Sequence, residues 1–304
     1  MRRGATMIED QKLREPDVPH RARLEMGHAL GEWAADRLGV RLLHIKGLAA
    51  EAVLPVGRGL SADVDLLVEP ARYREYVALL QSLATTQVVD DAGRSSEAHA
   101  IEIVSHGLSV SLDVHGHFPG YRADPATVFD VLHRRSVPVS FGGWECACLD
   151  RVGLAVLGVV HAARNPPGSR SGRMALHRWD LLDDDEQTEA LELIVELQAQ
   201  GAASTVIGYH AKASRRDIAL FLAHQRRARP ATLWLLTLIS TRGLRGRLNV
   251  LRRALSARSG LVDKVSSSAA RTPATGGRLR QGVRGLRPAM RESWTLLKEA
   301  RRDD

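Results

Sequence analysis

Two aspartates, Asp63 and Asp65, stand two residues apart at the head of an apolar run that ends at Val68. The uninterrupted Leu and Val residues after Asp65 are typical of a buried strand. Because side chains alternate faces along a strand, the two carboxylates are expected to point the same way. Like charges on one face of an apolar strand are costly unless a cation lies between them, and oxygen ligands suit Mg²⁺ or Mn²⁺. Two solvated acids at the start of a strand are the alternative interpretation.

A glycine turn precedes these acids. Residues 40–45 read as a short strand, Lys46 and Gly47 follow, and residues 48–54 read as a short helix. A strand–turn–helix unit presents free backbone N–H groups at the positive end of a helix, which suits a phosphate, and Lys46 adds a charge. In the alternative reading, Gly47 only allows the backbone angle of an ordinary turn. Arg58 lies in a basic link after the helix and could reach the same phosphates.

A third carboxylate follows on a predicted hairpin, after a candidate edge strand around residues 87–89. Residues 99–104 and 108–115 both alternate apolar and polar side chains, with a turn between them. On the second strand Asp113 and His115 share the polar face. A surface acid at Asp113 and an ordinary polar residue at His115 are the alternatives.

The hydrophobic pattern changes at about residue 150, from mixed helices and strands to helical periodicity throughout. We therefore expect an α+β protein with a mixed sheet, followed by an all-α C-terminal domain. The expected divisions are a flexible arm over 1–20, an α/β domain over 21–150, a helical domain over 151–257 and a basic, partly disordered tail over 258–304.

Helices are predicted before and after this change, beginning with one over 21–38. Asp150 is expected to cap the first helix after the change, and the acidic run 183–186 is expected to cap a later one. Further helical stretches are predicted over 174–182, 185–200, 202–212, 215–226 and 231–257, with a last short helix over 291–302.

The turn and the two acidic strands resemble, in this order, those of nucleotidyltransferases of the DNA polymerase beta superfamily. They are more closely similar to an uncharacterised bacterial nucleotidyltransferase family with a Lys-Gly turn, an Asp-x-Asp strand and a later Asp-x-His strand. The resemblance includes the His-Ala-Ala-Arg sequence at residues 161–164 and the Arg-Trp-Asp sequence at 178–180. It covers roughly residues 25–200 and implies a polymerase-beta-like α/β domain.

The resemblance implies transfer of a nucleoside monophosphate from an NTP, such as ATP, to a hydroxyl-bearing acceptor by a two-metal mechanism. The catalytic residues, which would also hold Mg²⁺ or Mn²⁺, are Asp63, Asp65 and Asp113. The nucleotide-binding residues would be Lys46, Gly47, Arg58 and His115. Three positions depart from the pattern. Leu48 replaces a serine that many members have after the turn, and Gly116 replaces an aromatic residue. Arg58 lies five residues before Asp63, where the family has an arginine about four residues before it.

The amino-acid composition indicates which classes of molecule the protein could bind. The net charge of +8 favours an anionic partner. The acceptor could be a small molecule, a peptide or protein side chain, or an RNA end, and only 4% aromatic residues argues against a protein that stacks on bases. Arginines of the tail are candidates for contact with a polyanion, with a solvated tail as the alternative.

Two other functions are compatible with parts of the sequence. The chain could be a non-catalytic module of the same fold that binds nucleotide or a protein partner, as an antitoxin or a biosynthetic accessory. A manganese-dependent glycosyltransferase would also use Asp-x-Asp, but the sequence lacks alternating parallel βα units before the motif.

The two cysteines, Cys146 and Cys148, read as reduced apolar side chains, and no apolar stretch of about 18 residues predicts a membrane span. A cytoplasmic protein is expected.

Overall fold

The computed structural model describes residues 18–57, 61–83, 86–89, 100–241, 243–252, 254 and 275–301. Arg58 and most of the predicted N-terminal arm lie outside the described residues, as does much of the predicted tail.

Seven strands in the described residues form one mixed sheet, in the order β3-β4-β5-β2-β1-β7-β6. The strands are β1 (Leu42–His44), β2 (Asp63–Val68), β3 (Thr86–Val89), β4 (Ala100–Ser105), β5 (Val110–His115), β6 (Ser136–Phe141) and β7 (Trp144–Leu149). β2 pairs with β5 in parallel and with β1 antiparallel, and β1 pairs with β7 in parallel. The remaining pairings are antiparallel and join β3 to β4, β4 to β5 and β6 to β7. The predicted α+β class with a mixed sheet is confirmed.

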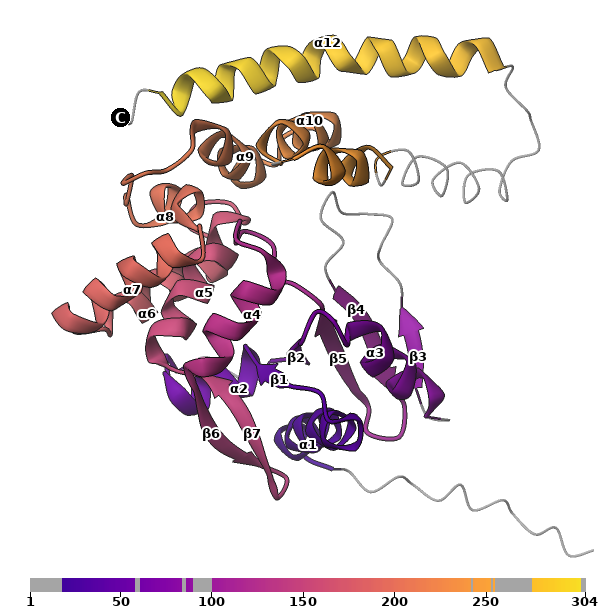
Figure 1. Ribbon diagram of the computed structural model, residues 1–304, viewed down its shortest axis with the longest axis vertical. Helices are drawn as coiled ribbons and strands as arrows, with labels where there is room; N and C mark the ends of the chain where they lie inside the picture. Colours follow the sequence, from indigo (N-terminus) through magenta and orange to yellow (C-terminus); the bar gives the residue numbers. More distant parts are fainter. Residues whose placement is uncertain are drawn as a thin grey trace, which may run out of the picture.

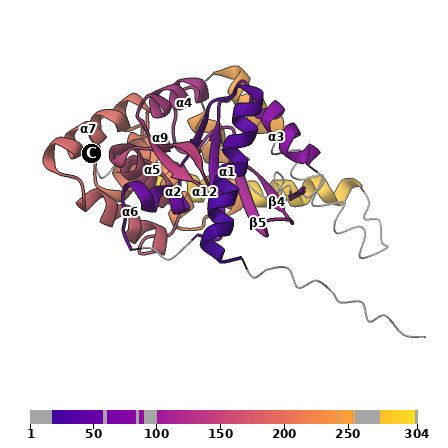
Figure 2. The same ribbon diagram turned by 90° about the horizontal axis from the view of Figure 1, so that it is seen from below.

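One face of the sheet is covered by α1 (His20–Leu38) and α3 (Tyr73–Ser82), and Figure 2 shows α1 running across it. Val64 and Leu66 of β2 pack in the same buried cluster as Leu24 of α1 and Tyr76 of α3. The Tyr76 hydroxyl donates a hydrogen bond to the Gly31 carbonyl at 2.8 Å, which ties the two helices together.

The other face carries a second hydrophobic cluster, built with α4 (Pro125–Arg134) and α5 (Arg151–Ala163). Leu67 of β2 and Leu43 of β1 belong to this cluster, because strand side chains alternate between the two faces. Asp63 and Asp65 are each an even number of residues from Leu67 along the strand, so their side chains point to the same face as Leu67. The acids therefore lie on the face toward α4 and α5.

Helices follow β7 to the end of the described chain (Figure 1). They are α6 (Arg170–Asp180), α7 (Asp184–Glu196), α8 (Gln200–Val206), α9 (Arg215–Gln225), α10 (Pro230–Ser240), a helical stretch over 244–252 and α12 (Thr275–Glu299). Among the described residues, no helix is both long and apolar enough to cross a membrane.

Two sequence-based expectations for these C-terminal helices need correction. The helix predicted over 231–257 is interrupted, because α10 ends at Ser240. The last helix begins at Thr275 rather than at 291, so much of the predicted loose tail is helical. Its C-terminal turns pack on α9 and α10, where Leu296 and Ala300 join Ile218 and Leu236 in one apolar cluster. This packing stabilises the C-terminal turns of the helix.

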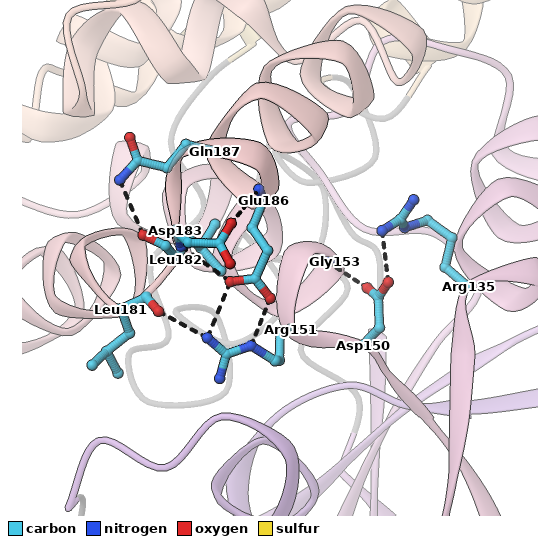
Figure 3. A network of polar contacts seen from close by, with 9 residues as sticks. All are labelled: Arg135, Asp150, Arg151, Gly153, Leu181, Leu182, Asp183, Glu186 and Gln187. Carbon is cyan, nitrogen blue, oxygen red and sulfur yellow. Dashed lines mark hydrogen bonds and ion pairs between the residues drawn. The ribbon is translucent and has the colours of Figure 1, made fainter.

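Polar contacts fix the junction between the sheet and these helices (Figure 3). Asp150 accepts a hydrogen bond from the Gly153 backbone at 2.7 Å, and so caps α5 as predicted. Arg135 donates to the same carboxylate at 2.6 Å. The predicted cap from the acidic run is also confirmed, because Asp183 and Glu186 form a reciprocal capping box at the start of α7.

Candidate functional site

The parallel pairing of β2 with β5 brings the acidic residues of the two strands together. Asp65 lies directly opposite Asp113 in the register, and Asp63 lies opposite Ser111. Paired residues of adjacent strands point to the same face, so the side chains of Asp65 and Asp113 are neighbours. Glu102 of β4 lies opposite Asp113 on the other side and accepts a hydrogen bond from the Ser111 hydroxyl at 2.5 Å.

His115 completes a compact group with two of the three aspartates. Its Nε2 lies 3.2 Å from Asp65 Oδ1 and 4.0 Å from Asp113 Oδ2. One ligand atom from each of Asp65, Asp113 and His115 lies within 4.8 Å of the others. The two carboxylate oxygens suit the predicted Mg²⁺ or Mn²⁺, whereas the imidazole nitrogen is a more usual ligand of zinc and similar transition metals.

Lys46 supplies a positive charge to this group. It is the N-cap residue of α2 (Gly47–Val53), and its Nζ forms an ion pair with Asp65 Oδ1. The same Nζ lies 5.2 Å from the ring centroid of Phe118, which is buried. Burial of Asp65 favours its neutral form, but Lys46 and His115 outweigh burial and hold its pKa well below the usual range.

The other two aspartates are harder to ionise. Burial raises the pKa of Asp63, and the charges of Asp65 and Asp113 raise it further. Burial also raises the pKa of Asp113, with His115 opposing and Asp65 adding to the effect. Three carboxyl groups in one partly buried place therefore repel one another. Asp63 contributes to this electrostatic cost without joining the compact group that Asp65, Asp113 and His115 form.

Gly47 is required by the close approach of its turn to the start of β2. Its φ is +60°, and a Cβ built on it would lie 2.5 Å from Ser61 Oγ. Ser61 in turn donates a hydrogen bond to the Asp63 carbonyl at 2.9 Å. Since α2 has only seven residues, the steric role of Gly47 is better supported than a phosphate site at the helix end.

Helices α5 and α6 contact the elements that form the site. Arg178 of α6 is buried and places its guanidinium 3.6 Å from a carboxylate oxygen of Glu51 in α2. His161 of α5 lies beside Phe118, with ring centroids 6.4 Å apart, and its Nε2 is 3.4 Å from the Ser171 hydroxyl. Two residues from the helical part of the resemblance, His161 and Arg178, thus contact Phe118 and α2 beside the site.

Sequence reasoning missed two aromatic side chains here. Phe118 packs under Lys46 and 5.7 Å from His115, and no spacing rule points to it. Tyr73 explains the glycine at 116, because a Cβ at Gly116 would lie 2.9 Å from the Tyr73 ring. The aromatic group that the resemblance expects after His115 is thus supplied from α3.

Comparisons with known proteins find only distant similarities to this chain. No protein-family model and no curated protein matches it. Its structure is similar to the solution structure of the antibiotic-resistance factor ANT(2'')-Ia, with 19% identity, a TM-score of 0.41 and coverage of 62% of this chain and 97% of that chain. It is also similar to an antigenic nucleotidyltransferase-like protein from Paracoccidioides brasiliensis, with 16% identity, a TM-score of 0.38 and coverage of 63% and 95%. Both likenesses are distant.

Proposed function

We propose that the chain is a metal-dependent nucleotidyltransferase that transfers a nucleoside monophosphate from an NTP to a hydroxyl-bearing acceptor. One observation carries the proposal: Asp65, Asp113 and His115 meet on neighbouring parallel strands, with the Lys46 ammonium on the same carboxylate. The acceptor would be a small molecule, a peptide or protein side chain, or an RNA end.

In this proposal Asp65 and Asp113 hold the divalent cations, with Asp63 as the third carboxylate. Bound Mg²⁺ or Mn²⁺ would neutralise charge on the attacking and leaving oxygens during in-line transfer at phosphorus. Asp113 is the better candidate to accept the hydroxyl proton, because 35% of its side chain is exposed, against 7% for Asp65, and an acceptor molecule could reach it. His115, predicted to bind nucleotide, would instead orient the two carboxylates or serve as a ligand.

Lys46 has two roles in the proposal. Without a cation it balances the charge of buried Asp65, which would otherwise be costly to ionise. With a cation bound to Asp65, the Lys46 ammonium would be available to the phosphates of the NTP. Phe118 beneath the ammonium limits the directions in which Lys46 can move.

Binding and turnover test the proposal separately. Thermal shift with each of the four NTPs, in Mg²⁺, Mn²⁺ or EDTA, measures metal-dependent binding, and mass spectrometry of candidate acceptors detects the added monophosphate. Asp65→Asn and Asp113→Asn should each lower transfer by about 1,000-fold, which corresponds to the several kcal/mol that metal ligation contributes.

Glu102→Gln is the matched control, because Glu102 lies on the same face beside Asp113 but outside the acidic group. It should leave binding and transfer close to the parent values. NTP binding that is equally strong in EDTA, or unaffected in both Asn variants, would refute metal-dependent transfer. Tight, metal-dependent NTP binding without transfer to any acceptor would favour the non-catalytic module.

A further inference from the structure

A second group of metal-ligating side chains lies on the opposite face of the sheet, under α1. His28 and Glu32 are one helical turn apart on α1, so they project from the same side of the helix. His44 comes from β1, and Cys146 from β7, which pairs with β1 in parallel. The side chains of His28, His44 and Cys146 are fully buried, and Glu32 is half-buried.

The distances within this group are those of a preformed ligand set. His44 Nε2 lies 3.0 Å from Glu32 Oε2. One ligand atom from each of Glu32, His44 and Cys146 lies within 4.8 Å of the others. Tetrahedral ligands about 2.0–2.3 Å from a zinc ion are separated by similar distances.

We propose that Glu32, His44 and Cys146 bind a zinc ion between α1 and the sheet, with water as the fourth ligand, at a site separate from the acidic group around Asp65. Carboxylate, imidazole and thiolate are the three ligand types that zinc takes in proteins. A carboxylate and a thiolate would balance the charge of the dication, so the occupied site would be neutral, as an apolar surrounding requires. Binding would release the thiol proton of Cys146 to solvent.

His28 is the positioning residue of this site. Its Nδ1 lies 2.7 Å from Nδ1 of His44, so one ring donates a hydrogen bond to the other. When His44 donates its Nδ1–H to His28, its Nε2 is free to face Glu32 and the metal. Ligating histidines commonly donate their second nitrogen in this way. The His28 ring is itself held by stacking on Phe141, with centroids 4.5 Å apart.

The half-buried carboxylate of Glu32 gives the site its route to solvent, since the other three side chains are buried in the core.

The proposed zinc site would also affect the proposed active centre around Asp65. β1 has only three residues, and Lys46 follows it after a single intervening residue. A metal on His44 would anchor the strand that positions Lys46 against Asp65.

Cobalt substitution of the full-length chain tests the proposal, because tetrahedral Co²⁺ with a thiolate ligand has a charge-transfer absorption that Mg²⁺ sites lack. The wild-type chain, purified without chelator, should contain about one zinc ion. After exchange, Co²⁺ should give the thiolate charge-transfer band together with the visible bands of a tetrahedral ion. Both should persist in the Asp65→Asn variant, which separates this site from the proposed active centre.

Cys146→Ala and Cys148→Ala form a matched pair, because both cysteines lie buried on the same strand and face, and only Cys146 belongs to the group. The band should vanish in Cys146→Ala and remain in Cys148→Ala. His28→Ala should weaken Co²⁺ binding by about 10- to 100-fold while leaving the band position unchanged.

The wild-type spectrum decides the question even if a variant fails to fold. Absence of zinc from the purified chain together with absence of a charge-transfer band in Co²⁺ overturns the proposal. So does a band that survives in folded Cys146→Ala or disappears in folded Cys148→Ala.

Discussion

Lys46 and Asp65 form an ion pair that joins the turn after β1 to the middle of the Asp-x-Asp strand. Only 7% of the Asp65 side chain and 20% of the Lys46 side chain are exposed. The pair connects the Lys-Gly turn to the Asp-x-Asp strand, although the two paired residues are almost twenty residues apart in the sequence. The Lys46 ammonium therefore balances part of the negative charge of the three aspartates before any ligand binds.

Replacing Lys46 by methionine should destabilise the fold, because it removes the cation that balances the buried Asp65 carboxylate and leaves the contact with His115. We expect a loss of about 1–3 kcal/mol in the free energy of unfolding, measured by urea denaturation. Adding Asp65→Asn to Lys46→Met should restore much of the loss, since the uncompensated charge is then gone. Additive losses in the double variant would show that the pair does not couple.

Replacing Gly47 by alanine should cost more than the same change at Gly39. Both glycines have φ close to +60°, but a Cβ at Gly39 meets no atom within 4 Å, whereas one at Gly47 lies 2.5 Å from Ser61 Oγ. Gly39→Ala should therefore cost about 1–2 kcal/mol for the left-handed backbone alone. Gly47→Ala adds the clash, and Ser61→Ala in the same chain should relieve part of it. Equal melting temperatures for the two single variants would contradict this reasoning.

Two substitutions of Asp150 should separate its cap from its ion pair. Asp150→Ala removes both the bond from the Gly153 backbone and the bond from Arg135 (Figure 3). Asp150→Asn keeps an oxygen that can cap α5 and loses only the charge. We expect Asp150→Ala to cost about 1–2 kcal/mol in chemical denaturation and Asp150→Asn distinctly less. If the two cost the same, the ion pair rather than the cap holds the junction.

The ion pair between Arg122 and Asp217 should matter more than the one between Arg226 and Glu299. Arg122 lies 2.8 Å from a carboxylate oxygen of Asp217 in α9, and both side chains are less than 20% exposed. The Arg226 and Glu299 side chains are 51% and 35% exposed. Arg122→Met should lower the free energy of unfolding by about 3 kcal/mol, and Arg226→Met by less than about 1 kcal/mol. The two variants share one substitution type, so a reversed order in calorimetry would be inconsistent with burial as the cause.

Much of the local structure can be predicted from the sequence, because it depends on patterns within a few residues. The apolar run after Asp65 predicts its strand, and Asp150 and the acidic run at 183–186 predict two helix caps that the structure confirms. The roles assigned to Asp63, Arg58 and the other site residues stay predictions.

The rest depends on contacts between distant segments. Asp65 rather than Asp63 faces Asp113, because the parallel register sets that match, and no local pattern specifies a register between strands so far apart. The group of Glu32, His44 and Cys146 comes from three elements, so it leaves no characteristic spacing. The first part of the final helix, up to residue 290, is predicted as loose tail because its apolar residues are few, and it continues into turns that pack on α9 and α10.

The pairing of β2 with β5 has a consequence for how related chains can differ. The chain between Val68 and Val110 leaves the centre of the sheet, builds α3, β3 and β4, and returns beside the strand it left. Residues can therefore be inserted or deleted in that excursion without moving Asp113 relative to Asp65, provided the register of the two strands is kept. Distant relatives of this chain should be aligned strand by strand, since the sequence distance between the two acids is free to vary.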